Sequence, residues 1–193
     1  IPVSLVCIVF LNRYFFGALA HRTAVHKTRK IRVMPTVTVI IPVYNEGPTI
    51  FDTLKTISAQ SYPRHLLNIT VVDDCSTDDS YEWAQRAARD DERITVIHNA
   101  TNLGKRIGIT RAVRTSESDF IVSVDSDVIV DHYAVERLIH SFDDPSVAAV
   151  GGKVMVTNCR TNWLSQMQAI KYFFGYEYLK NLERSLGTIM CLS

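Results

Sequence analysis

The stretch Phe120-Ile121-Val122-Ser123-Val124-Asp125-Ser126-Asp127 joins an apolar run directly to two carboxylates. The run predicts a buried strand, which places Asp125 and Asp127 at its carboxyl end. In open α/β sheets, ligands bind outside the carboxyl ends of the strands. We expect one carboxylate to hold a divalent cation and the other a polar ligand group, and oxygen ligands beside substrate phosphates favour Mg²⁺ or Mn²⁺. The alternative is a solvated turn, because Asp favours turns.

Short apolar runs of the same kind alternate with helical patterns on both sides of this stretch. Strands are predicted at 37–41, 69–72, 94–97, 120–124, 147–150 and 154–156. Helices are predicted from residue 47 to about 60, then at 80–88, 105–114 and 132–142. This alternation predicts an α/β fold with a doubly wound, mostly parallel sheet. The strands are continuously apolar, as expected when both faces of a sheet are covered.

Two other strand ends also carry polar groups. The first is followed by Pro42-Val43-Tyr44-Asn45-Glu46 and the second by Asp73-Asp74-Cys75-Ser76-Thr77-Asp78. Carboxylates repeated at one edge of a sheet are costly unless ligands or cations compensate them. A simple turn at Asn45-Glu46-Gly47 and a helix cap at Asp73-Asp74 are the alternatives. Their joint placement favours a ligand site.

Positive charge comes from Gly104-Lys105-Arg106, at the start of a predicted helix. A helix N-terminus favours an anion, and lysine is a common partner of phosphate. The alternative is a solvated surface lysine. The first strand is not followed by Gly-x-Gly-x-x-Gly, and Gly104-Lys105 is not followed by Ser or Thr, which disfavours a dinucleotide fold and a phosphate loop.

The composition narrows the choice of partners. The 193 residues carry a formal net charge of +1, which argues against a polyanion ligand, so no nucleic-acid partner is predicted. The four cysteines share no metal-type spacing and are predicted to be reduced thiols facing the cytosol. The chain is expected to be part of a longer protein.

The two ends of the chain differ from its middle. Residues 1–20 are mostly apolar and are predicted to be a partial transmembrane or membrane-associated helix, and 21–35 a basic cytosolic linker. A signal peptide would carry its charge on the other flank, and an amphipathic surface helix is a further alternative. Residues 36–158 form the predicted α/β domain. Residues 159–193 are predicted to contain one amphipathic helix at 163–182, whose aromatic face meets either the membrane or the core.

These motifs resemble those of a known family in order and spacing. Val39-Ile40-Ile41-Pro42-Val43-Tyr44-Asn45-Glu46, Val71-Val72-Asp73-Asp74-Cys75-Ser76-Thr77-Asp78, Asn102-Leu103-Gly104-Lys105-Arg106 and Val124-Asp125-Ser126-Asp127 resemble the donor half of family-2 inverting glycosyltransferases. The residues of these motifs are most similar to those of membrane-embedded processive synthases of the hyaluronan and chitin type. The resemblance covers 37–193 and implies a nucleotide-sugar-binding, glycosyltransferase-A-like fold.

The resemblance also implies roles for individual residues. Pro42, Tyr44 and Glu46 would line the uridine pocket, and Asp74 would hold the base. Lys105 would contact the nucleotide or its diphosphate.

At the metal, Asp125 would contact the nucleotide and share in metal binding, and Asp127 would bind Mg²⁺ or Mn²⁺. The general base would lie beyond Ser193. Lys153 departs from hyaluronan synthases, which tend to carry an acid there.

The implied partners are a UDP-sugar donor, a polysaccharide acceptor and membrane lipid. The implied location is the plasma membrane, with the catalytic domain on the cytosolic side. A non-processive family-2 transferase acting on a lipid or protein, and an inactive nucleotide-binding relative, are the alternatives.

Overall fold

A computed structural model describes residues 11, 15, 33–142, 147–180 and 183. The predicted helix at 1–20, apart from Leu11 and Phe15, and most of the predicted linker at 21–35 lie outside the described residues. No helix among the described residues is long and apolar enough to cross a membrane. The chain divides into two compact units, 30–143 and 1–29 with 144–193, and each is described by itself.

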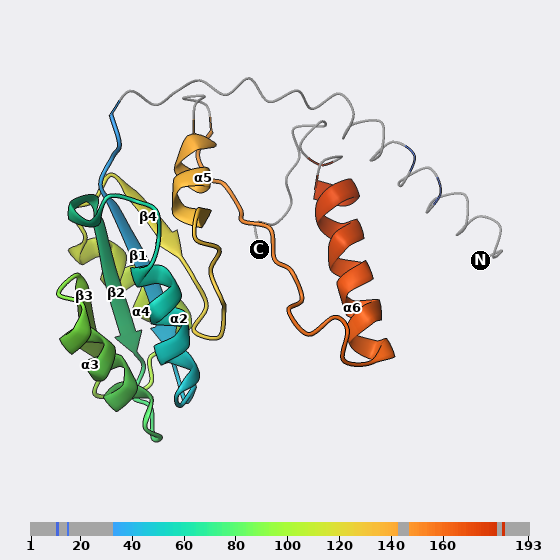
Figure 1. Cartoon of the computed structure of the whole chain (residues 1–193). Coiled ribbons are helices and arrows are strands. Elements are labelled where there is room, and N and C mark those ends of the chain that lie inside the picture. The colour runs from blue at the N-terminus through green and yellow to red at the C-terminus, as the bar shows by residue number, and fades with distance from the viewer. Residues whose placement is uncertain (1–10, 12–14, 16–32, 143–146, 181–182, 184–193) are drawn as a thin grey trace. The chain divides into compact units, whose positions relative to one another are not determined.

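The first unit is built on a four-stranded sheet in which every pairing is parallel (Figure 1). Its strands are β1 (Val37–Val43), β2 (Leu67–Asp73), β3 (Ile94–His98) and β4 (Phe120–Ser123), in the order β3-β2-β1-β4. The predicted α/β class and the four strands from 37 to 124 are therefore confirmed. The chain leaves β1 towards β2 and β3 and returns to its other side as β4. The switch point lies between β1 and β4, where α/β sheets open a crevice at their carboxyl ends.

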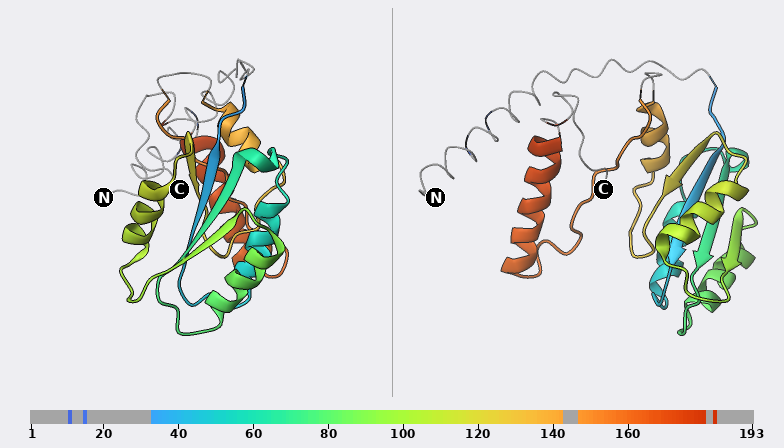
Figure 2. Two further views of the ribbon diagram at one scale, coloured as in Figure 1. Left: turned by 90° about the vertical axis from the view of Figure 1, so that its left-hand side faces the viewer. Right: turned by 180° about the vertical axis from the view of Figure 1, so that it is seen from behind.

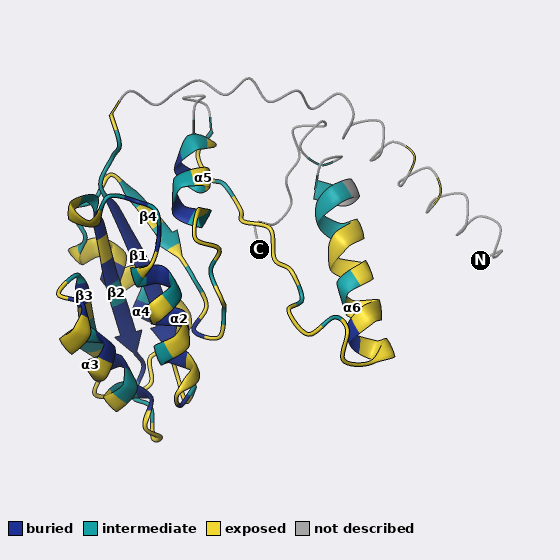
Figure 3. Ribbon diagram, viewed as in Figure 1, coloured by how far each residue is buried: buried dark blue, intermediate teal, exposed yellow. Residues whose placement is uncertain are grey.

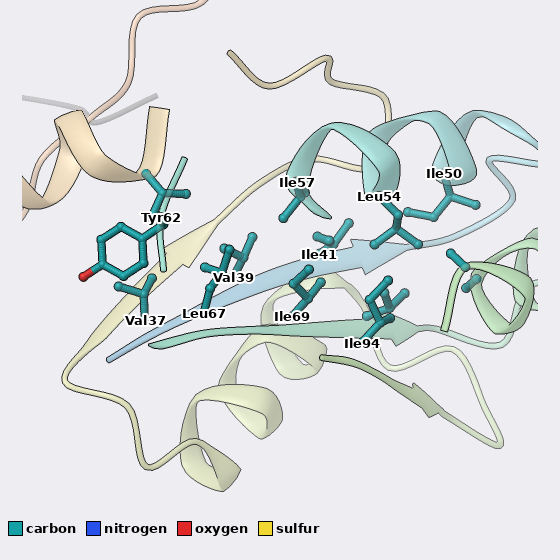
Figure 4. Close-up of a cluster of buried hydrophobic side chains, with 14 of the residues drawn as sticks. Val37, Val39, Ile41, Ile50, Leu54, Ile57, Tyr62, Leu67, Ile69 and Ile94 are labelled. Atoms are coloured by element: carbon teal, nitrogen blue, oxygen red, sulfur yellow. The ribbon is translucent and has the colours of Figure 1, made fainter. Parts of the chain in front are cut away.

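Helices cover both faces of this sheet, as the doubly wound class requires (Figure 2). On one face, α2 (Thr49–Ser58), α3 (Ser80–Asp90) and α5 (Ala134–His140) contribute to the larger core, part of which is drawn in Figure 4. In α2, the buried Ile50, Leu54 and Ile57 lie on one side because their spacing follows the helical repeat. The other face is covered by α4 (Lys105–Thr115), whose Ala112 packs on Ile40 and Val72. Every residue of β1 is buried, so β1 is the centre of the core.

Two sequence predictions in the later part of the chain are wrong. Residues 147–150 and 154–156 are not strands, and Val154 and Met155 are exposed. A strand exists only when another strand pairs with it, and β propensity is context-dependent. The helix predicted at 132–142 is also shorter, because α5 covers only Ala134–His140.

The second unit contains α6 (Trp163–Phe174), followed by a π-helical segment, Gly175–Lys180. A capping box starts α6, because Ser165 N donates to the Asn162 side chain and the Ser165 hydroxyl accepts from Asn162 N. The predicted single helix at 163–182 is thus α-helical only to Phe174. Most of α6 is exposed (Figure 3), including Trp163 at 74% and Phe173 at 50%. Membrane contact by this face stays a prediction.

Candidate functional site

The carboxyl ends of β1, β2 and β4 open onto a cleft of about 270 Å³ in the first unit. The residues that line it are Pro42, Val43, Tyr44, Glu46, Asp74, Lys105, Asp125, Ser126 and Asp127. The structure therefore brings together all seven residues singled out in the sequence, although their individual roles stay predictions. Val43 and Ser126 also line the cleft but were not predicted. Each directly neighbours predicted residues, and this adjacency could have identified them.

The loop after β1 is tied to the loop after β2 through Asn45. Asn45 has φ of 54° and Cys75 has φ of 64°, a left-handed region that Asn tolerates better than most residues. Oδ1 of Asn45 accepts from Thr77 N at 2.8 Å, and Asn45 N donates to Ser76 Oγ at 3.1 Å. The tight turn that carries Tyr44 and Glu46 is thus held by the loop after β2.

Ser80 makes a second link between the same two loops. Its side chain is fully buried, and its hydroxyl oxygen accepts from the N–H groups of Glu46 and Gly47, both at 2.8 Å. Ser80 in turn donates to Asp78, whose other oxygen accepts from Gly47 N at 3.0 Å. Ser80 is the first residue of α3, and its side chain stabilises the loop after β1.

The two adjacent acids at the end of β2 have different surroundings. Asp73 is fully buried and accepts from the Ser76 hydroxyl, and its Oδ2 lies 2.6 Å from Nδ1 of His98. Asp73 does not line the cleft, so it serves the fold.

Asp74 does line the cleft and is only 5% exposed. It accepts hydrogen bonds from Asn99 at 3.0 Å, Leu103 N at 2.9 Å and Gly104 N at 2.7 Å. Burial by itself raises the pKa of Asp74, but these three hydrogen bonds outweigh it and lower the pKa below its ordinary value. The carboxylate is therefore charged at neutral pH and fixes the turn that precedes Lys105.

The opposite wall of the cleft consists of exposed charged groups. Nζ of Lys105 lies 2.6 Å from Oδ1 of Asp125, and both side chains are 59% exposed. Asp127 is exposed as well, and among the described residues its carboxylate has no hydrogen-bond or ion-pair partner. Lysine thus acts as the counter-ion of the first carboxylate.

The carboxylates at this wall fit a hard divalent cation whose coordination is completed by a bound ligand. In the part of the chain that the structure describes, no three or more His, Cys, Asp or Glu side chains are grouped so that they alone could hold a metal ion. Mg²⁺ is commonly held by one or two carboxylates together with substrate phosphates, and it does not need a cage made only of protein groups. Asp125 and Asp127 match that donor set.

Two polar residues of α2, Thr53 and Thr56, together with Gln60 just after the helix, support the loop that carries these two acids. The buried Thr53 hydroxyl donates to the carbonyl of Ser126 at 2.7 Å, and the Thr56 hydroxyl accepts from Val130 N at 3.1 Å. The Gln60 amide donates to the carbonyl of Asp131 at 2.8 Å. These three residues recur at the helical spacing, which was an available signal, but sequence reasoning considered only the apolar side of α2.

This geometry defines a class: a parallel α/β domain of the glycosyltransferase-A type, with acidic strand ends around one cleft. Residues 38–192 match the protein family described as Glycosyl transferase family 2. The chain belongs to that family, which confirms the family resemblance of its motifs.

Two kinds of curated relatives are similar to this chain. N-acetylglucosaminyltransferases from Bradyrhizobium diazoefficiens and Rhizobium leguminosarum bv. viciae are 32% and 34% identical, each over 82% of the chain. A hyaluronan synthase from Streptococcus pyogenes is 31% identical over 81% of the chain. The chain spans only 33%, 37% and 38% of the lengths of these three relatives, respectively.

Solved structures give the same fold. The mannosyltransferase PcManGT from Pyrobaculum calidifontis, in complex with GDP-Man and Mn²⁺, superposes with a TM-score of 0.69 at 28% identity. The match covers 79% of this chain and 46% of that one. S. aureus TarS 1–349 in complex with UDP shares the fold at 24% identity, with a TM-score of 0.51, over 64% of this chain and 42% of that one.

Proposed function

We propose that this chain is the donor-binding part of a UDP-sugar-dependent hexosyltransferase. The observation that carries the proposal is one cleft in which six predicted residues from three strand ends meet Lys105 at the start of α4. Family membership and relatives named as N-acetylglucosaminyltransferases support it. Those names favour UDP-N-acetylglucosamine as the first donor to test.

In this proposal each wall of the cleft binds a different end of the donor. Pro42, Tyr44, Glu46 and Asp74 hold the uridine end, where the backbone is fixed by the hydrogen bonds between the two loops. The solved relative that binds GDP-Man supports a nucleotide-sugar in a fold of this kind.

Lys105, Asp125 and Asp127 hold the diphosphate end. Lys105 exchanges its bond with Asp125 for a bond with phosphate, which releases Asp125 for the metal and the nucleotide. When bound, Mg²⁺ or Mn²⁺ would neutralise the charge that develops on the departing UDP. Lys105 adds positive charge at the same place. The acceptor hydroxyl attacks from the opposite side of the sugar, with inversion, and its general base belongs to the rest of the protein.

The proposed product is a polysaccharide of the hyaluronan or chitin type. Similarity to a hyaluronan synthase and to N-acetylglucosaminyltransferases supports this. A non-processive transferase that uses a lipid or protein acceptor, and an inactive relative that only binds nucleotide, are the competing proposals. Intact Lys105, Asp125 and Asp127 argue against the inactive one.

The proposed location is the cytosolic side of the plasma membrane. The support comes from the apolar 1–20 and basic 21–32 sequence and from the exposed apolar residues of α6. Membrane lipid is the proposed partner of these segments.

Calorimetry with the full-length protein tests the proposal. UDP and UDP-N-acetylglucosamine are expected to bind in Mn²⁺ and to bind at least ten-fold more weakly in EDTA. GDP serves as the control for base selectivity, because the fold relative binds GDP-Man. Tighter binding of GDP than of UDP, or equal UDP affinity in EDTA, would contradict the proposal. Incubation with radiolabelled UDP-N-acetylglucosamine then separates a polymer product from a single transfer and from no transfer.

A further inference from the structure

Two residues outside the cleft are connected to Asp74 through consecutive hydrogen bonds. Arg111 on α4 donates from Nη1 to Oδ1 of Asn99 at 2.8 Å, and Asn99 donates from Nδ2 to Oδ1 of Asp74 at 3.0 Å. Neither Arg111 nor Asn99 lines the cleft. Sequence reasoning identified neither of them, although Asn99 directly follows the end of β3.

The guanidinium decides how the Asn99 amide is oriented. A guanidinium can only donate, so it requires the amide oxygen of Asn99 to face Arg111. The amide nitrogen must then face Asp74, where it donates to the carboxylate. Asn99 is 1% exposed, so water does not compete for these bonds. With the amide reversed, its oxygen would face a carboxylate oxygen, and both contacts would be lost.

Asp74 passes this constraint to the first residues of α4. Its oxygens also accept from Leu103 N and Gly104 N, the two residues that precede Lys105. Gly104 has φ of 85°, a conformation that strains other residues, so this turn is sharply defined. Four residues later the helix lies close to the sheet: a Cβ at Gly108 would meet Cγ1 of Val72 at 3.1 Å. The path from Arg111 therefore returns to the beginning of the same helix.

We propose that Arg111 and Asn99 are positioning residues that hold Lys105 over the diphosphate end of the cleft by way of Asp74. The inference rests on the proposed function, because it assigns Lys105 to phosphate. Arg111 also contributes charge, but its guanidinium is bonded to Asn99 and it does not reach the cleft. Its effect on ligand binding is therefore indirect.

The test compares Arg111→Met with Arg114→Met in the full-length protein. Both arginines are exposed on α4, and the described residues include no hydrogen-bond or ion-pair partner for Arg114. Arg111→Met is expected to weaken UDP binding in Mn²⁺ by two- to five-fold, which is no more than the loss of Lys105 itself, and to weaken uridine binding by a smaller factor, because Asp74 also lies at the uridine end. It is also expected to shift the Leu103 and Gly104 amide signals in NMR spectra recorded without ligand. Arg114→Met leaves all three measurements unchanged.

Asn99→Asp gives a second variant: it keeps an acceptor for Arg111, but it replaces the donor to Asp74 with a carboxylate oxygen that repels that acid. It is expected to reproduce both the amide shifts and the loss of UDP affinity. Unchanged amide signals in Arg111→Met would overturn the hydrogen-bonded path itself. Equal losses for UDP and uridine would overturn the assignment to Lys105. If the unaltered protein binds no nucleotide, the proposed function fails, but the amide signals still report on the path.

Discussion

The two walls of the cleft differ in how they are held. On the β1–β2 wall, the backbone is held by two buried side chains, since Ser80 is fully buried and Asp74 is 5% exposed, and by the exposed Asn45, which bridges the two loops. On the opposite wall, Lys105 and Asp125 are both 59% exposed and are joined by a single ion pair. Exposed ion pairs contribute little to stability, typically about 0–1 kcal/mol.

Under the proposed function, this difference implies that the nucleoside wall is formed before the donor arrives, while the phosphate wall is completed by the donor. Preformed hydrogen bonds reduce the ordering cost of binding. Exposed charges of both signs can change partners when a diphosphate and a cation enter. Substitutions on the first wall should therefore change stability, and substitutions on the second should change ligand affinity.

The largest expected effect is on the buried wall. Ser80→Ala removes the acceptor of the Glu46 and Gly47 N–H groups, and we expect it to lower the free energy of unfolding by about 2 kcal/mol. Urea unfolding measures this. Ser141→Ala is the control: its hydroxyl bonds only a helix carbonyl at an exposed site, so a change within about 0.5 kcal/mol is expected. Equal losses in the two variants would remove the distinction between the walls.

On the exposed wall, Asp127→Asn should act on ligand binding. We expect UDP affinity in Mn²⁺ to fall more than ten-fold, which is over about 1.4 kcal/mol, while the free energy of unfolding is unchanged. Calorimetry and urea unfolding test the two halves of this expectation. Asp52→Asn, an exposed carboxylate on α2 outside the cleft, is the control. Full UDP affinity in Asp127→Asn would exclude this carboxylate from the metal site.

Lys105→Met tests whether the lysine acts on the phosphates and not on the base, and whether it competes with the metal for Asp125. UDP affinity should fall about five-fold, or roughly 1 kcal/mol, while uridine affinity stays the same, because the lysine acts on phosphate charge. Mn²⁺ alone should bind more tightly, since Asp125 loses its counter-ion. Arg106→Met removes the same charge from the next residue and is the control for general electrostatics. If both variants raise Mn²⁺ affinity equally, the Lys105–Asp125 pair has no special role.

The smallest expected effect is on how the free energy of unfolding depends on pH in the acidic range. Burial raises the pKa of Asp74 and Asp78, but hydrogen bonds to each carboxylate outweigh burial and lower both below 3.8. The unfolded chain then binds more protons than the folded one just below that value. The contribution of these acids to stability is fully present above 3.8 and is lost as the pH falls through the lowered pKa values.

Asp74→Asn should therefore make the free energy of unfolding less dependent on pH between about pH 5 and pH 3. Urea unfolding across that range is the measurement. An unchanged slope would show that Asp74 is not preferentially ionised in the folded state.

Much of the fold and cleft could be predicted because strands and their ends are local features. A contiguous apolar run such as 37–41 identifies a strand, and parallel topology then brings the residues after several strands to one edge. This rule points to the segments after β1, β2 and β4 without any knowledge of contacts, and the family resemblance singled out the seven cleft residues in these segments and at the start of α4. The same local rule failed at 147–156, since an apolar run does not say whether a pairing partner is available.

The sequence by itself determined the parallel α/β class, the order of the motifs and the segments that form the cleft, because hydrophobic periodicity and strand ends can be identified along the chain. Only the tertiary structure decided what each polar group does. Asp73 meets His98 25 residues away, Lys105 meets Asp125 20 residues away, and Thr53 meets the Ser126 carbonyl 73 residues away. Hydrogen bonds depend on distances of about 3 Å in space, and no pattern along the chain specifies them. For that reason two adjacent aspartates that look equivalent in the sequence differ in the structure, where Asp73 serves the fold and Asp74 lines the cleft.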